Sequence, residues 1–177
     1  KVTLRFDYKL LDDGSTINSG VIHRLVAGSR ENWLIDSSPY SSADHQPEPK
    51  TTTPKANELD YALLRLDGSP GADVLGEPTL SAERGHLTLP TLGSSHDFAA
   101  NKVLFIVQHP KGEPLKITAN IYRSHNDNGT RVTYLNDTEP GSSGSPCFDA
   151  NWKLVALHHS GDPHYTKPGQ YNEGIPM

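Results

Sequence analysis

The chain has 177 residues, 34% hydrophobic content, a formal net charge of −5 and one cysteine, Cys147. A single cysteine excludes an intrachain disulfide framework, and an acidic balance without a basic stripe argues against a nucleic acid partner. No apolar run reaches the ~18 residues that a membrane span needs, so we expect no membrane partner. The 15 glycines and 14 prolines favour many short strands joined by turns.

The apolar runs are short and strand-like along the whole sequence, and no helical periodicity persists, which predicts an all-β chain. In chain order the expected strands are Val2–Tyr8, Gly20–Val26, Asn32–Asp36, Tyr61–Leu66, Val103–Gln108, Leu115–Ile121, Arg131–Leu135, Pro146–Asp149, Lys153–His158 and finally Tyr171–Met177.

Two long connections interrupt this series. Residues 37–56 contain Pro47, Pro49 and Pro54, so they cannot pair as an internal strand, and we expect an exposed, mobile loop. Residues 67–85 are rich in glycine and proline and have the composition of a linker between two structural units.

Residues 137–148 are the most informative stretch, because Gly-x-Ser-Gly-x-Pro places Ser143 on a tight turn between two glycines. Gly141 and Gly144 can adopt backbone angles that other residues avoid. The turn can therefore aim the amides of Gly141 and Ser143 at one point, as an oxyanion hole requires. A Gly/Ser-rich surface loop is the alternative for this motif taken alone.

Two further segments support a nucleophilic Ser143. Asp60 precedes the apolar run Tyr61–Leu66, and a carboxylate there can orient a histidine base. An ordinary loop aspartate is the alternative. The strand at 152–161 ends in His158, His159 and Gly161 soon after the serine turn.

Together these motifs resemble the trypsin-like (chymotrypsin-fold) serine endopeptidases. Gly141-Ser142-Ser143-Gly144-Ser145-Pro146 is closer to the bacterial glutamyl endopeptidase branch, and residues 108–116 resemble the QHP-x-G-x-P-L-K hairpin of bacterial trypsin-like domains. The resemblance implies an all-β, two-barrel trypsin-like fold with an incomplete first barrel. It also implies an N-terminal barrel with connector at 1–80 and a C-terminal barrel at 81–177.

The resemblance implies a serine endopeptidase in which Ser143 attacks the peptide bond, Asp60 orients a histidine, and the amides of Gly141 and Ser143 form the oxyanion hole. We expect Asp60 to face Ser143 across a gap wide enough for an imidazole. Neither His23 nor His45 fits the family's histidine turn. We therefore expect the chain to begin within the first barrel, with its catalytic histidine upstream, and to be inactive by itself.

The resemblance also places substrate-binding residues. Thr138 and His158 correspond to the pocket of the glutamyl branch and would bind an acidic side chain. Asp137 corresponds to the pocket aspartate of trypsin and would favour a basic one, so both specificities stay open, as does a purely structural His158. His159 and Gly161 lie on the strand that pairs with substrate backbone in the family.

We expect no cofactor and no metal, since neighbouring His158 and His159 point to opposite faces of a strand. Cys147 is expected in the core. The expected partners are a protein or peptide substrate and the other domains of a longer chain. The alternatives are an inactive, protease-derived binding module and a protease effector domain of a larger bacterial protein. The sequence leaves the location of the protein open, and a cytoplasmic one is favoured.

Overall fold

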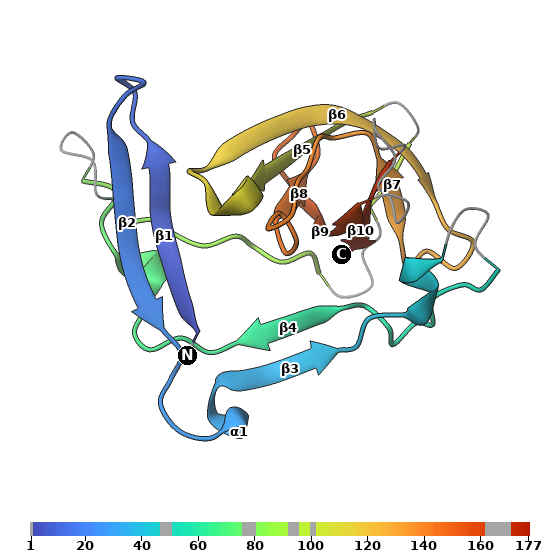
Figure 1. Cartoon of the computed structure of the whole chain (residues 1–177), viewed down its shortest axis with the longest axis horizontal. Coiled ribbons are helices and arrows are strands. Elements are labelled where there is room, and N and C mark those ends of the chain that lie inside the picture. The colour runs from blue at the N-terminus through green and yellow to red at the C-terminus, as the bar shows by residue number, and fades with distance from the viewer. Residues whose placement is uncertain (1, 47–50, 76–80, 92–95, 100–101, 162–170) are drawn as a thin grey trace. The chain divides into compact units, whose positions relative to one another are not determined.

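The computed structural model describes residues 2–46, 51–75, 81–91, 96–99, 102–161 and 171–177, and these form ten strands (Figure 1). The strands are β1 Thr3–Leu10, β2 Ile17–Arg24, β3 Leu34–Ser38, β4 Tyr61–Leu64, β5 Val103–Gln108, β6 Lys116–His125, β7 Val132–Tyr134, β8 Pro146–Phe148, β9 Leu154–Gly161 and β10 Asn172–Pro176. Each predicted strand is therefore confirmed within a few residues.

The described helices are all short. The α-helix α1 covers Arg30–Trp33, and single 3₁₀ turns cover Ser42–His45, Pro70–Ala72 and Pro110–Gly112. The prediction of a strand from Asn32 was wrong at its first two residues, because Ser29 caps α1 by exchanging hydrogen bonds with Asn32. None of the described helices has the length and apolar character needed to cross a membrane.

Six strands close a barrel in the order β10-β7-β6-β5-β8-β9. On β5 every second residue, Leu104, Ile106 and Gln108, is buried, as expected for a strand with one face toward a core. The buried barrel core consists of Leu104, Ile106, Tyr122, Val132, Tyr134, Cys147, Val155 and Ala156. Cys147 thus lies in the core as predicted, and burial raises its pKa to about 12.

The described chain divides into two compact units, residues 1–37 with 62–87 and residues 38–61 with 88–177. The second unit contains the barrel. In the first unit, β1 and β2 form a two-stranded antiparallel sheet. Arg84, which lies after residue 80, belongs to this unit and forms ion pairs with Asp7 at 2.6 Å and with Asp73 at 3.2 Å. The boundary proposed at residue 80 stays a prediction.

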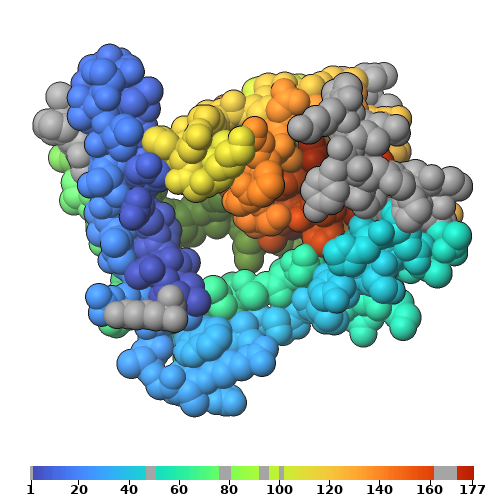
Figure 2. Space-filling model, viewed as in Figure 1, coloured from blue at the N-terminus to red at the C-terminus, as the bar shows by residue number. Residues whose placement is uncertain are grey.

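The segment between β3 and β4 differs from the mobile loop that its prolines predicted. Ser41, Ala43, Asp44 and Pro54 are buried. Asp44 pairs with Arg131 of the barrel unit at 2.8 Å, and the carbonyl of Pro54 accepts a hydrogen bond from Asn128. In Figure 2 the cyan atoms of this segment lie against the red and orange atoms of the barrel. A buried ion pair, which composition does not reveal, holds the segment in place.

Candidate active site

The turn that carries Ser143 is shaped by two glycines with positive φ, Gly141 at 98° and Gly144 at 84°. Ser143 is exposed, whereas its neighbour Ser142 is fully buried and its Oγ accepts a hydrogen bond from the Glu139 amide at 3.3 Å. The turn therefore presents one serine to solvent and uses the other to hold its shape.

The backbone amides of this turn alternate between bonded and free. Ser142 N donates to Glu139 O at 3.0 Å and Gly144 N donates to His158 O at 2.7 Å. The amides of Gly141 and Ser143 donate to no group in the described part of the chain. Two free donors beside an exposed hydroxyl are what an oxyanion hole requires.

The 108–116 hairpin supports the serine turn from behind. Lys111 N donates to Pro140 O at 2.8 Å, which fixes the Pro140–Gly141 peptide plane. A Cβ at position 141 would lie 3.3 Å from Lys111 N, so only glycine fits this contact without displacement. The Lys111 ammonium also pairs with Glu139 at 2.6 Å, and Gln108 donates to Asp137 O at 3.0 Å.

Asp60 and Ser143 both contact His159, but with different parts of it. The Asp60 carboxylate lies 2.8 Å from His159 Nδ1. The Ser143 hydroxyl donates to the His159 carbonyl at 3.0 Å and, among the described residues, bonds to no imidazole. Sequence reasoning placed His159 on the substrate-pairing strand, and it did not anticipate that the His159 side chain is 95% buried between carboxylates.

His158 points to the opposite side of β9 and is 97% buried. Its Nδ1 lies 2.7 Å from the hydroxyl of Tyr134, which donates to Glu173 O at 3.0 Å. Because a carbonyl only accepts, the Tyr134 oxygen accepts from Nδ1–H, and Nε2 of a neutral ring is left as an acceptor. Burial, aided by His159, lowers the pKa of His158 to about 4, so the ring is neutral at pH 7.

Thr138, the other predicted pocket residue, is half-buried, and its hydroxyl donates to Asn172 Oδ1 at 2.8 Å. Asn172 also bonds to Asn136 O and pairs in register with Gly161 of β9. Thr138 and Gly161 are therefore both neighbours of the same residue, Asn172 of β10. Asp137 is exposed.

A buried cluster next to His159 has residue types that can bind a metal. One ligand atom each of Asp44, His159 and Glu173 lie within 4.8 Å of one another. Arg131, however, makes a bidentate pair with Asp44 at 3.0 and 2.8 Å and lies 3.6 Å from Glu173. The guanidinium already supplies positive charge here and would repel a second cation, so these residues suit an ion-pair network better than a metal.

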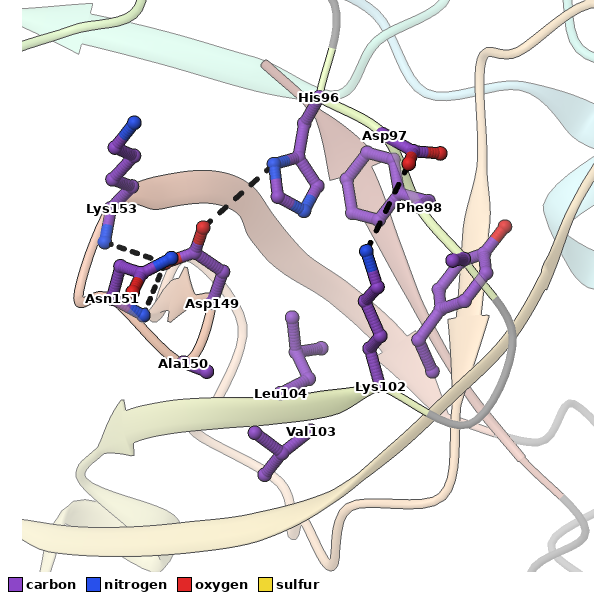
Figure 3. Close-up of a pocket in the computed structure, with 12 residues that line it drawn as sticks. His96, Asp97, Phe98, Lys102, Val103, Leu104, Asp149, Ala150, Asn151 and Lys153 are labelled. Carbon is purple, nitrogen blue, oxygen red and sulfur yellow. Dashed lines mark hydrogen bonds and ion pairs between the residues drawn. The ribbon is translucent and has the colours of Figure 1, made fainter.

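A cavity of about 340 Å³ lies elsewhere on the barrel unit (Figure 3). It is lined by residues 96–99, the start of β5 and the turn at 149–153. His96 points toward Asp149 at 4.0 Å, and Lys102 pairs with Asp97 at 3.8 Å. None of the predicted site residues lines this cavity, so the candidate site is the serine turn with its neighbours.

Comparison with known families agrees with this geometry. Residues 14–157 match the model of the trypsin-like peptidase domain. The chain belongs to this family. Its all-β architecture with one closed six-stranded barrel and small sheets is the trypsin-like fold that the sequence predicted.

Two curated proteins and one solved structure are similar to this trypsin-like peptidase domain. Secreted RxLR effector protein 73 of Plasmopara viticola is 32% identical over 128 residues, 64% of this chain and 27% of that protein. Exfoliative toxin A of Staphylococcus aureus is 28% identical over 120 residues, 66% of this chain and 39% of that protein. The chain therefore spans well under half of these curated relatives. An inactive mutant form of Rv3671c from M. tuberculosis H37Rv matches with a TM-score of 0.45 and 15% identity, over 67% of this chain and 55% of that one.

Sequence reasoning missed four residues around the candidate site: Asp44, Arg131, Tyr134 and Asn172. Arg131 had a signal, because a cation beside the apolar strand Val132–Tyr134 must find a buried partner or stay in solvent. Asp44 lay in a segment whose prolines suggested an exposed loop. Tyr134 and Asn172 contact His158 and Thr138, which lie 24 and 34 positions away in the chain, and spacing along the sequence does not indicate such contacts.

Proposed function

We propose that this trypsin-like peptidase domain belongs to a serine endopeptidase in which Ser143 is the nucleophile. The observation that carries the proposal is the pair of unbonded amides at Gly141 and Ser143, beside an exposed hydroxyl. Such donors stabilise the negative charge that develops on the carbonyl oxygen during attack.

In this mechanism Asp60 orients a histidine general base that lies outside the described residues. The base removes the Ser143 proton as the hydroxyl attacks the peptide carbonyl, and it later protonates the leaving amine. Ser143 must first give up its present hydrogen bond to the His159 carbonyl, which is a weak neutral bond at 3.0 Å.

For specificity we propose that Thr138 and His158 contact the side chain before the scissile bond, with an acidic residue as the preferred one. The Thr138 hydroxyl and the His158 Nδ1 proton already have acceptors. A substrate carboxylate therefore requires His158 to take up a second proton at Nε2. The exposed Asp137 is the competing determinant and would favour a basic side chain.

The test is covalent labelling of the full-length protein with a serine-directed fluorophosphonate, followed by peptide mapping and a casein hydrolysis assay. We expect label on Ser143 and loss of turnover by at least about 10³-fold in Ser143→Ala. Ser145→Ala is the matched control, since this serine lies in the same turn and should keep both signals. A protein that binds peptides but neither labels nor hydrolyses would instead be a protease-derived binding module.

A further inference from the structure

His159 connects the two groups that the proposed reaction needs. Its carbonyl accepts from Ser143, while its ring nitrogens face two carboxylates, Asp60 at 2.8 Å from Nδ1 and Asp44 at 3.2 Å from Nε2. Both ring nitrogens lie close to a carboxylate oxygen, but neither contact has the alignment of a hydrogen bond. One residue of β9 thus reaches the nucleophile with its main chain and the acid with its side chain.

The carboxylate on the Nε2 side is rigidly held. Arg131 donates to both oxygens of Asp44, and its remaining bonds go to the carbonyls of Glu58 at 2.7 Å and Thr130 at 2.9 Å. Burial raises the pKa of Asp44, but the contacts with His159 and Arg131 outweigh burial and hold that pKa well below its usual range. Asp44 is therefore a fixed, ionised anchor for the His159 ring.

The backbone at Asp60 is also constrained. Asp60 has a φ of 43°, which is uncommon for a residue other than glycine, and its amide donates to Pro39 O at 3.0 Å. The preceding Leu59 amide donates to the Ser38 hydroxyl at 2.8 Å. The carboxylate itself is 46% exposed, so His159 contacts one oxygen and leaves the rest of the group accessible.

The charged groups that the structure places around His159 lie on several segments of the chain. Asp44, Asp60 and Glu173 are acidic, Arg131 is the fixed cation, and the neighbouring His158 is neutral at pH 7. Three carboxylates facing one guanidinium leave an environment that attracts a proton-donating ring.

We infer that His159 is a positioning residue, which fixes Asp60 Oδ2 so that Asp60 Oδ1 can orient the general base. This inference rests on the proposed function. The chain of contacts runs from Arg131 through Asp44 and His159 to Asp60. The partly exposed Asp60 carboxylate therefore takes its orientation from the buried ion pair of Arg131 and Asp44.

Matched variants of the full-length protein separate positioning from mere folding. The amide nitrogen of Asn occupies roughly the place of His Nδ1, and that of Gln the place of His Nε2. His159→Asn should therefore keep a donor to Asp60 and retain kcat within about threefold, whereas His159→Gln should lower kcat roughly 10-fold with KM nearly unchanged. The exposed His125 provides the control, and His125→Gln should leave both constants unchanged.

The deciding measurement repeats His159→Gln in an Asp60→Asn background. If His159 acts through Asp60, the second substitution should change kcat less than about twofold there. Equal losses in both backgrounds, an effect confined to KM, or no difference between the Asn and Gln variants would overturn the inference. Urea unfolding of each variant checks that the fold persists. A parent protein whose Ser143 neither labels nor turns over substrate refutes the proposed function, and the positioning role with it.

Discussion

His158 and His159 are neighbours on β9, yet their environments differ in kind. The His158 ring bonds to the uncharged hydroxyl of Tyr134 and forms no ion pair with a carboxylate of the described residues. His159 lies between Asp60 and Asp44, with Arg131 behind them. Burial is nearly complete for both side chains, so exposure does not distinguish them. Their bonding partners distinguish them, because successive side chains of a strand point to opposite faces of the sheet and so meet different groups.

The comparison shows that burial affects a histidine according to what it is buried with. Without an acidic partner the charged ring loses hydration without compensation, and this burial, together with the neighbouring His159, lowers the pKa of His158 to about 4. The His159 ring instead lies close to two carboxylates, Asp60 and Asp44. The roles proposed above, recognition of a substrate side chain for His158 and positioning of Asp60 for His159, rely on this difference.

The largest expected effect comes from removing the cation behind His159. Arg131→Met leaves Asp44 buried without its bidentate partner, and we expect the free energy of unfolding to fall by about 3–5 kcal/mol. Urea unfolding at pH 7 measures this loss. Arg131→Met combined with Asp44→Leu should recover most of it, since no unpaired charge stays buried.

Arg84→Met in the first unit is the control for that prediction. Arg84 also pairs with two aspartates, but water reaches this group more easily: the Arg84 side chain is 14% exposed and its partners Asp7 and Asp73 are 9% and 34% exposed, against 1% for Arg131 and 3% for Asp44. The loss should therefore be clearly smaller than for Arg131→Met. Equal losses would show that burial of the ion pair does not set its importance.

The neutral His158 should make stability depend on pH. Between its unfolded pKa of about 6.5 and its folded pKa of about 4, the unfolded chain binds a proton that the folded chain does not. The free energy of unfolding should therefore rise with pH through this window. Up to about 3 kcal/mol of it should be lost when the pH falls from about 6.5 to about 4.

Urea unfolding of His158→Phe at pH 7 and pH 4.5 tests this, because the variant should lose less stability than the parent on acidification. Asp44 acts in the same direction but at lower pH, since its pKa is also lowered on folding and its contribution to stability is lost only as the pH falls below the usual range for aspartate. An unchanged slope between pH 6.5 and 4.5 in His158→Phe would contradict the assignment.

The smallest expected effect concerns specificity. At neutral pH the free Nε2 of His158 accepts hydrogen bonds and suits the amide of a Gln substrate, whereas a Glu substrate needs the doubly protonated ring. The ratio of kcat/KM for Glu over Gln before the scissile bond should therefore rise severalfold as the pH falls from 7 toward 5.

Tyr134→Phe sharpens this test, because without the phenol oxygen Nδ1 loses its acceptor and Nε2 can carry the proton instead. In Tyr134→Phe the ratio of kcat/KM for Glu over Gln before the scissile bond should therefore be higher at pH 7 than in the parent protein. Cleavage after Lys or Arg that is indifferent to His158→Ala would assign the pocket to Asp137 and refute the acidic preference.

Local patterns determined the elements of this fold. A short, continuous apolar run predicted the strand Val103–Gln108 to the residue, although only every second residue of it is buried in the core. Glycines at 141 and 144 predicted the serine turn, since both positions have positive φ. The contacts of residues 38–46 could not be read in this way, because Asp44 finds Arg131 87 positions later in the chain.

The sequence by itself determined the strands, the turn around Ser143 and the opposite facing of His158 and His159, all of which follow from spacing within a few residues. The order of its motifs along the whole chain indicated the family. The tertiary structure decided which charges meet. Whether a histidine is neutral beside Tyr134 or paired between Asp44 and Asp60 depends on strands and segments that are distant in sequence, and electrostatic energies depend on distance and burial rather than on order along the chain.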